Sequence, residues 1–154
     1  RDTAGHNAGV VARATKGSVG RHAERIVEPV LEAEAASDSG RANIAAVIYD
    51  RLNAGMPLQI DATVMYALGE HKEFLTVEDT QVQSPYNTYI NTGLPAGPIS
   101  NPGLASVNAA LNPGQTDYMY YALDTESGTH QFFTTYEEFE AFTATQDYTG
   151  GAGE

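Results

Sequence analysis

The feature that most constrains the fold is a pair of adjacent helical patterns, each with a charged side chain inside its apolar stripe. Residues 26–35 place apolar side chains at helical spacing, and Glu34 falls near the middle of that arc. Residues 41–53 form a second pattern, in which Arg51 occupies the centre of the stripe. A buried charge without a partner is strongly destabilising. We therefore predict that the two helices pack together and that Glu34 pairs with Arg51.

The remaining periodicity and turn signals outline a fold with helices first and strands late. Pro29 lies inside the first helical pattern, so we expect that helix to kink or restart there, and Gly55 is expected to end the second helix. The later segments predict a short helix at 62–68 closed by Gly69, a proline- and glycine-rich loop at 84–102, a helix at 104–111, a β-hairpin of strands 118–123 and 130–134, and a last helix at 136–142. This order is typical of an α+β fold.

The chain is the size of one domain. It has 154 residues, of which 42% are hydrophobic, enough for a core of its own. Residues 1–20 and 144–154 are rich in small residues and glycine, and we expect a flexible lead-in or linker and a flexible tail there. The folded body is predicted to be residues 21–143.

The charge balance excludes several classes of partner. With 20 acidic and 8 basic residues, the formal net charge is −12. Such a surface repels phosphate backbones and anionic lipids, so we expect no nucleic-acid partner and no membrane contact by this domain itself. A neutral or zwitterionic polymer meets no such penalty. The chain contains no cysteine, which excludes disulfides and thiol nucleophiles.

No motif in the sequence indicates a cofactor or a metal. The four histidines, His6, His22, His71 and His130, lack the spacing of a zinc site, and no phosphate-binding or dinucleotide-binding motif is present. We therefore expect neither a metal nor a cofactor. For His130, on a predicted strand, both hairpin packing and a position facing a substrate groove remain open.

Glu32 lies on the flank of the first apolar arc, beside small alanines. Ala33 and Ala35 are among its neighbours, so space is left for a ligand to approach the carboxylate. Two interpretations remain open from the residues alone. One is a solvated surface glutamate, and the other is a general acid whose pKa is raised by partial burial and a nearby carboxylate.

Seven sequence blocks follow one another along residues 27–139: Val30–Ala35, Ile44–Leu52, Gly55–Val64, Tyr66–Gly69, Tyr86–Tyr89, Gly93–Ile99 with Asn101–Gly103, and His130–Phe132. In this order they resemble the YceG-like (MltG) endolytic murein transglycosylases. Among the departures are Ala62, where the family usually has proline, and Asp50, where it usually has asparagine.

The resemblance implies an enzyme that cleaves the β-1,4 bond between N-acetylmuramic acid and N-acetylglucosamine, forming a 1,6-anhydro end. It implies that Glu32 acts first as acid and then as base, with Glu34 and Arg51 in support. It also implies that a set of polar and aromatic residues binds the glycan: Gln59, Asp61, Tyr86, Asn87, Thr88 and Tyr89. Asp61 and Thr63 could equally cap the helix that begins at Ala62.

The resemblance also implies a place and partners. The expected substrate is peptidoglycan glycan strands, and cell-wall synthases active in division are candidate protein partners. The expected location is the extracytoplasmic face of the bacterial cell membrane, and the family's amino-terminal membrane helix and LysM-like subdomain are absent from this sequence. Three alternatives remain: a non-catalytic peptidoglycan-binding module, an adaptor for cell-wall synthases, and a hydrolase of lysozyme type.

Overall fold

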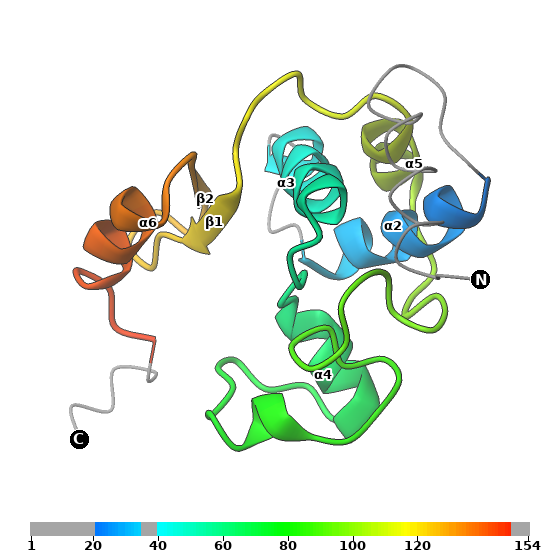
Figure 1. Ribbon diagram of the computed structural model, residues 1–154, viewed down its shortest axis with the longest axis horizontal. Helices are drawn as coiled ribbons and strands as arrows, with labels where there is room; N and C mark the ends of the chain where they lie inside the picture. The colour runs from blue at the N-terminus through cyan, green and yellow to red at the C-terminus, as the bar shows by residue number, and fades with distance from the viewer. Residues whose placement is uncertain (1–20, 35–39, 149–154) are drawn as a thin grey trace.

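The computed structural model describes residues 21–34 and 40–148, so the predictions for residues 1–20 and 149–154 lie outside the described part of the chain. No helix within it is both long and apolar enough to cross a membrane. The elements in chain order are α2 (Arg21–Glu34), α3 (Arg41–Ala54), α4 (Asp61–Leu68), the 3-10 turn η2 (Asp79–Gln81), α5 (Leu104–Leu111), β1 (Tyr120–Leu123), β2 (His130–Phe133) and α6 (Tyr136–Thr143). This arrangement confirms the predicted α+β fold (Figure 1).

The core lies where α2, α3 and α5 pack against one another. Val27 and Leu31 of α2 and Ile44 and Ile48 of α3 are buried in one cluster, because helical spacing brings each pair to one face. Burying side chains of this size stabilises the fold by about 1.5–3 kcal/mol each. The hydroxyl of Tyr49 on α3 donates a 2.9 Å hydrogen bond to a backbone carbonyl of α5, which satisfies a polar group inside the core.

Two glycines end helices where the sequence predicts it. Gly55 follows α3 with φ of 73°, and Gly69 follows α4 with φ of 77°, both in the left-handed region that suits glycine. The α4 helix begins at Asp61, one residue before the predicted start, and its cap residue Ile60 offers no side-chain hydrogen bond. Asp61 is therefore not the N-cap residue of α4, and its side chain can make other contacts.

The predicted restart at Pro29 is wrong, because α2 runs as one helix from Arg21 to Glu34 with the proline inside it. Proline removes one backbone donor from the helix. The apolar side chains on both sides of it, Val27, Val30 and Leu31, are nearly fully buried, and this burial outweighs the lost hydrogen bond. The carbonyl of Pro29 itself accepts a 2.7 Å hydrogen bond from the Ser100 hydroxyl.

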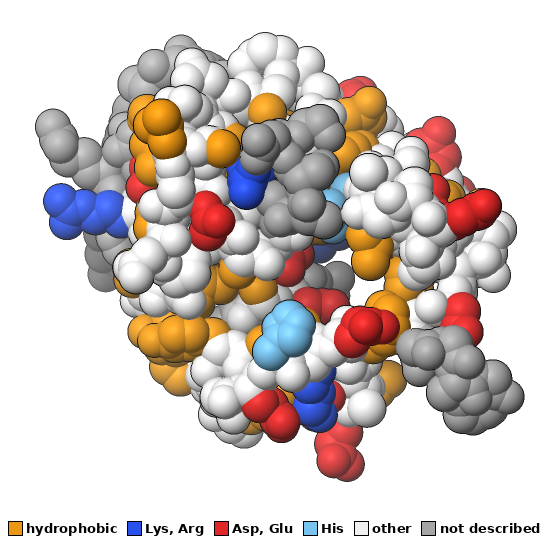
Figure 2. All heavy atoms as spheres, turned by 180° about the vertical axis from the view of Figure 1, so that it is seen from behind, with side chains coloured by type: hydrophobic (Ala, Val, Ile, Leu, Met, Phe, Trp, Pro, Cys, Tyr) orange, Lys and Arg blue, Asp and Glu red, His pale blue; other side chains and the backbone are white. Residues whose placement is uncertain are grey.

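The hairpin and α6 form a smaller lobe beside the helical body (Figure 1). β1 and β2 are antiparallel, with Tyr120 opposite Phe133. Tyr120 and Phe133 both pack against Phe139 of α6, so the lobe has an aromatic core of its own. The α6 helix starts with a complete capping box between Thr135 and Glu138. Figure 2 shows a hollow between this lobe and the body, with acidic and histidine side chains around it.

The folded part extends beyond the predicted boundary at residue 143. The Tyr148 hydroxyl donates a 2.6 Å hydrogen bond to the carbonyl of Leu123, and its ring packs against Phe74 of the helical body. Gln146 accepts hydrogen bonds from the backbone and side chain of Thr125. Residues 146–148 therefore tie the hairpin lobe to the body and are part of the domain.

Candidate active site

A cavity of about 540 Å³ opens between the helical body and the hairpin lobe. Its size lies within the range of ligand-binding clefts. It brings together residues from α2, α3, α4, the loop after η2 and both strands, including five of the predicted site residues. Those five are Glu34, Arg51, Gln59, Asp61 and Tyr89, and they are joined in the lining by Tyr121, His130, His71 and Tyr148.

Glu34 is the carboxyl group with the properties of a proton donor. Its Oε1 accepts a 2.6 Å hydrogen bond from the Tyr121 hydroxyl, and the backbone N–H of Ala62 donates a further one. Loss of solvation and the negative charge of Asp61 raise the pKa of Glu34, the two hydrogen bonds partly oppose the rise, and together these effects bring the pKa to about 7. A proton is therefore available on Glu34 near neutral pH, which a general acid requires.

Asp61 and Tyr89 form a second polar pair beside Glu34. The Tyr89 hydroxyl donates a short hydrogen bond to Asp61 Oδ1, which links the first turn of α4 to the loop. Burial raises the pKa of Asp61, and this hydrogen bond opposes the rise. Burial and the neighbouring Asp61 charge raise the pKa of Tyr89, which keeps its phenol protonated. The pair holds a carboxylate close enough to Glu34 to influence its protonation.

The predicted ion pair between Glu34 and Arg51 is wrong. The Arg51 guanidinium donates to backbone carbonyls instead, at 2.7 Å to Met119 and 2.9 Å to Pro57. It also lies 5.0 Å from the centroid of the Tyr120 ring. Both side chains lie in the apolar region that the helical pattern predicts, but they contact different partners. Arg51 fixes the start of the hairpin to α3, and a tyrosine rather than a cation contacts Glu34.

Glu32 points to a different surface and has a structural partner there. Its Oε1 accepts hydrogen bonds from the N–H of Gly103, at 2.7 Å, and from the hydroxyl of Ser106, at 2.9 Å. Gly103 is the cap residue of α5, so the carboxylate sits at the positive end of that helix. These two hydrogen bonds lower the pKa of Glu32, which keeps it ionised. It does not line the cavity, and an ionised carboxylate cannot donate the first proton.

Three residues predicted to bind the glycan support the loop instead. Asn87 and Thr88 are 0% and 1% exposed, which leaves no surface for a sugar. The Asn87 amide donates to the carbonyls of Thr80 and Val82, and the Thr88 hydroxyl accepts from the N–H of Ile60. The ring of Tyr86 packs against Tyr66, with centroids 4.7 Å apart, and lies outside the cavity lining. Only Tyr89 of this block reaches the cavity.

Gln59 lines the cavity and has an unusual backbone conformation. It is exposed and has φ of 51°, and apart from glycines no other described residue has a positive φ. This conformation costs a non-glycine residue about 1–3 kcal/mol and is often kept at functional sites. A 3.2 Å hydrogen bond from its backbone N–H to the Thr88 carbonyl holds it in place. The strained backbone directs the exposed amide at the cavity edge.

The sequence assigns Tyr121 no role in the site, and it leaves the role of His130 open. Tyr121 lies on β1 and faces Glu34, because alternate residues of a strand point to opposite sides. Tyr120, its neighbour, faces α6 instead. His130 lies opposite Leu123 in the hairpin and contacts the Tyr121 ring edge-on at 5.3 Å. Burial lowers the pKa of His130, which favours its neutral form in the cavity lining.

A second cavity, of about 450 Å³, adjoins the first and shares Glu34 with it. Met65 and His71 also border both cavities. The residues found in the second cavity alone are mostly small or apolar: Ala33, Ala62, Tyr66, Gly69, Glu70 and Ile99. Glu34 therefore lies where the two neighbouring cavities meet.

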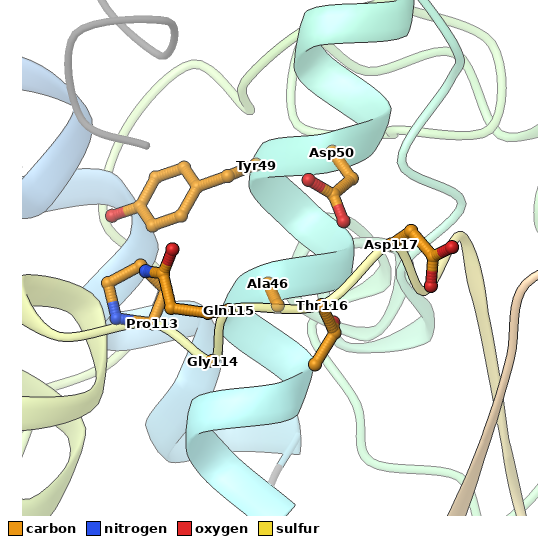
Figure 3. A pocket seen from close by; sticks show the side chains of 8 residues that line it. All are labelled: Ala46, Tyr49, Asp50, Pro113, Gly114, Gln115, Thr116 and Asp117. Atoms are coloured by element: carbon orange, nitrogen blue, oxygen red, sulfur yellow. The ribbon is translucent and has the colours of Figure 1, made fainter. Parts of the chain in front are cut away.

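A third cavity, of about 370 Å³, lies away from Glu34, between α3 and the segment after α5 (Figure 3). Asp50 of α3 and Asp117 of the connecting segment both line it. Burial, together with the charge of Asp117, raises the pKa of Asp50 to about 6. Asp50 Oδ2 is buried and has no hydrogen-bond partner among the described residues. This pair of carboxylates disfavours the folded state at neutral pH.

The sequence profile of the YceG-like family matches residues 14–145. The chain belongs to the YceG-like family. That match spans the elements that build the cavity, from α2 to α6. A crystal structure of a putative yceG-like protein from Listeria monocytogenes has a TM-score of 0.77 and 44% sequence identity. The match covers 89% of this chain and 45% of the Listeria chain.

Two curated relatives of this YceG-like domain are endolytic murein transglycosylases. The protein from Bacillus subtilis strain 168 is 47% identical over 106 residues, which is 69% of this chain and 29% of the relative. The protein from Streptococcus pneumoniae serotype 2 is 32% identical over 119 residues, or 74% of this chain and 22% of the relative. The chain thus spans less than a third of the length of these relatives.

Proposed function

We propose that this chain is the catalytic domain of an endolytic peptidoglycan transglycosylase, with Glu34 as its acid and base. The observation that carries the proposal is the place of Glu34 where two cavities meet, with its Oε1 bonded by the Tyr121 hydroxyl, and a pKa raised to about 7 supports it. The named activity of the relatives from B. subtilis and S. pneumoniae supports peptidoglycan as the substrate. The acidic surface is compatible with a glycan, which carries no phosphate backbone to repel.

Glu34 replaces Glu32 in this assignment for two reasons. A general acid must reach the substrate while protonated, and Glu34 combines a place in the cavity lining with a raised pKa. Glu32 has a lowered pKa and has both the N–H of Gly103 and the hydroxyl of Ser106 bonded to one oxygen. We assign Glu32 to the stability of α5 and Glu34 to the chemistry.

The reaction needs one carboxyl group that acts twice. Protonated Glu34 donates its proton to the glycosidic oxygen between N-acetylmuramic acid and N-acetylglucosamine. The bond from C1 to that oxygen breaks, and its electron pair stays with the departing sugar. The carboxylate then takes the proton of the C6 hydroxyl, whose oxygen bonds to C1. A 1,6-anhydro ring forms, no water is consumed, and Glu34 is protonated again.

The neighbours of Glu34 suit this cycle. The Tyr121 hydroxyl, whose pKa is raised far above its ordinary value, remains protonated and orients Glu34 Oε1 in both states. Asp61 raises the pKa of Glu34, which keeps the proton available at neutral pH. The exposed amide of Gln59 can bond acetamido and hydroxyl groups of the glycan. We propose these four residues as the reacting group and its polar surroundings.

A product assay tests the reaction itself. The chain is incubated with purified peptidoglycan, and soluble products are examined by mass spectrometry. We expect muropeptides with a 1,6-anhydromuramyl end, formed by the parent chain and lost in the Glu34→Gln variant. Products heavier by one water would indicate a lysozyme-type hydrolase and overturn the proposal. Binding to peptidoglycan without products would indicate a binding module instead.

The proposed substrate also implies a place. Peptidoglycan lies outside the cytoplasmic membrane, so we propose that the domain works on the extracytoplasmic side, held there by a membrane anchor elsewhere in the protein. Cell-wall synthases are proposed partners, because glycan cleavage has to be coordinated with glycan synthesis during growth and division. A pull-down with the parent chain and the Glu34→Gln variant tests this independently of cleavage.

A further inference from the structure

The cavity that adjoins the catalytic one has no assigned role, and it has the features of a sugar-binding subsite. Its volume of about 450 Å³ is within the range of ligand pockets. Its lining is mostly apolar and combines one aromatic ring with small residues, Ala33, Ala62 and Gly69, that leave room around it. A flat apolar surface with few polar groups suits the C–H face of a pyranose.

Tyr66 is the residue that distinguishes this cavity. It lies on α4 and remains 48% exposed, although most large apolar side chains of the helical body are buried. Its ring therefore presents an accessible aromatic surface in the lining of the second cavity. It is the aromatic residue that lines the second cavity, and it does not line the first.

A second aromatic ring packs against the ring of Tyr66. The ring of Tyr86 packs against it with centroids 4.7 Å apart. Tyr86 is fixed in turn by Gly97, since a methyl group at Gly97 would lie 3.0 Å from the Tyr86 hydroxyl. Tyr86 thus acts through Tyr66 rather than on a ligand. A pre-positioned ring loses little entropy when a ligand stacks on it.

The two cavities meet at the proposed acid. Glu34, Met65 and His71 line both of them, so the second cavity lies directly beside the carboxyl group that we assign to the chemistry. An enzyme that cuts within a strand must hold sugar rings on both sides of the bond that it breaks. The second cavity, which meets the first at Glu34, can supply one of these sides, and this inference rests on the proposed function.

We propose that Tyr66 forms a second sugar-binding subsite, in which its exposed ring stacks on a pyranose of the peptidoglycan strand on one side of the bond cleaved at Glu34. Ala33 and Ala62 leave space for that ring, and Tyr86 holds Tyr66 in position. Tyr66 is a binding residue in this account and takes no part in proton transfer.

Binding in the absence of turnover tests the subsite. The parent for this test is the Glu34→Gln variant, and the probe is a set of soluble GlcNAc–MurNAc strands of defined length. We expect Tyr66→Ala to weaken the binding of strands long enough to cross Glu34 by about tenfold in isothermal titration calorimetry. Tyr66→Phe keeps the ring and should bind within twofold of the parent.

Tyr136 provides a matched control. It is 51% exposed and packs against Tyr120 and Phe139, but it lines neither cavity. Tyr136→Ala should leave strand affinity unchanged. Equal losses in Tyr66→Ala and Tyr136→Ala, no loss in Tyr66→Ala, or no binding by the parent would each overturn the subsite. The melting temperatures of the variants establish that both are folded.

Fluorescence gives a second readout, because the chain contains no tryptophan. Tyr66→Trp introduces a single indole at the proposed subsite, and Tyr136→Trp introduces one at the control position. We expect added strands to shift the emission of the first protein and not that of the second. An unchanged spectrum for Tyr66→Trp at saturating strand would contradict the proposal. Neither readout depends on products, so failure of the subsite is distinguishable from failure of the catalytic assignment.

Discussion

The hydroxyl of Tyr121 donates a 2.6 Å hydrogen bond to Glu34 Oε1, joining the first strand of the hairpin to the end of α2 across 87 residues of sequence. The contact places the proposed acid at the boundary between the helical body and the hairpin lobe. It also stabilises the ionised form of Glu34, so it opposes the rise of the pKa that burial causes. The hairpin thereby takes part in tuning the acid.

Removing that hydroxyl should move the pH profile of cleavage toward higher pH. In Tyr121→Phe the ionised form of Glu34 loses a donor, so its pKa rises above about 7. The alkaline limb of kcat/KM reports loss of the proton from the free enzyme's acid. We expect this limb to shift upward by about one pH unit, the size of one charge-assisted hydrogen bond. A pH series of initial rates measures it.

Two further variants serve as comparisons for the predicted shift in Tyr121→Phe. Asp61→Asn removes a negative charge that raises the pKa of Glu34, so its alkaline limb should move to lower pH. Tyr120→Phe loses a hydroxyl from the neighbouring strand position, whose ring faces α6, and should leave the profile in place. Shifts of the same sign in Tyr121→Phe and Asp61→Asn would contradict the account.

Glu34 should reduce stability at neutral pH. Its pKa in the folded state, about 7, lies above the ordinary value of 4.5, so folding favours the protonated form. The stability it contributes is complete below about pH 4.5 and is lost as the pH rises through about 7. The difference, 7 − 4.5 = 2.5 units, sets an upper limit of about 3 kcal/mol.

The Glu34→Gln variant tests that sign. It carries no charge to desolvate, so we expect it to be more stable than the parent at pH 8, by about 1–3 kcal/mol, and similar to it at pH 4. Urea unfolding at the two pH values gives the comparison. Equal stability at pH 8 would mean that the carboxyl group is not desolvated.

Glu32 should matter for folding. The hydroxyl of Ser106 is fully buried and donates to Glu32, as does the N–H of Gly103. Glu32→Ala leaves both donors without this acceptor, and we expect the free energy of unfolding to fall. Glu32→Gln keeps an acceptor oxygen and should lose less. If Glu32→Ala unfolds like the parent in urea, the carboxylate does not hold α5.

Asp50 should be a site where a substitution stabilises the domain. Its Oδ2 is buried and has no hydrogen-bond partner among the described residues, and Asp117 adds like charge (Figure 3). Because the pKa of Asp50 is raised to about 6, its unfavourable charge is present at pH 7. Asp50→Asn should gain about 1 kcal/mol at pH 7, reduced from the full value by partial exposure. The exposed Glu126→Gln is the control and should change little.

The sequence predicts the elements of this fold well, because most of its signals are local. Gly55 and Gly69 end α3 and α4, since each can adopt a left-handed conformation whatever its surroundings. The predicted hairpin and last helix are also found, as β1, β2 and α6. The failure at Pro29 is of a different kind, since burial of the α2 face outweighs a local penalty that the sequence pattern alone would predict.

The candidate site is less accessible from sequence. A helical wheel correctly indicates that Glu34 lies beside the buried face of α2, but it cannot identify a partner 87 residues away. It therefore chooses Arg51, the opposite charge inside the apolar stripe of the neighbouring helix. Asn87 and Thr88 are chosen for their polar side chains, yet Asn87 bonds the backbone of its own loop and Thr88 accepts from the N–H of Ile60. Residue type indicates the chemistry that is possible, and burial decides where it occurs.

The central claim is that the proton comes from Glu34 and not from its neighbour two residues earlier. The most direct measurement compares kcat/KM for release of 1,6-anhydromuramyl products by the parent chain, Glu34→Gln and Glu32→Gln. Loss of a general acid costs about 10²–10⁴-fold. We predict a loss of that order in Glu34→Gln and a rate within about fivefold of the parent in Glu32→Gln, where an acceptor for Gly103 and Ser106 remains. The reverse pattern, with Glu34→Gln active and a folded Glu32→Gln inactive, would contradict the account.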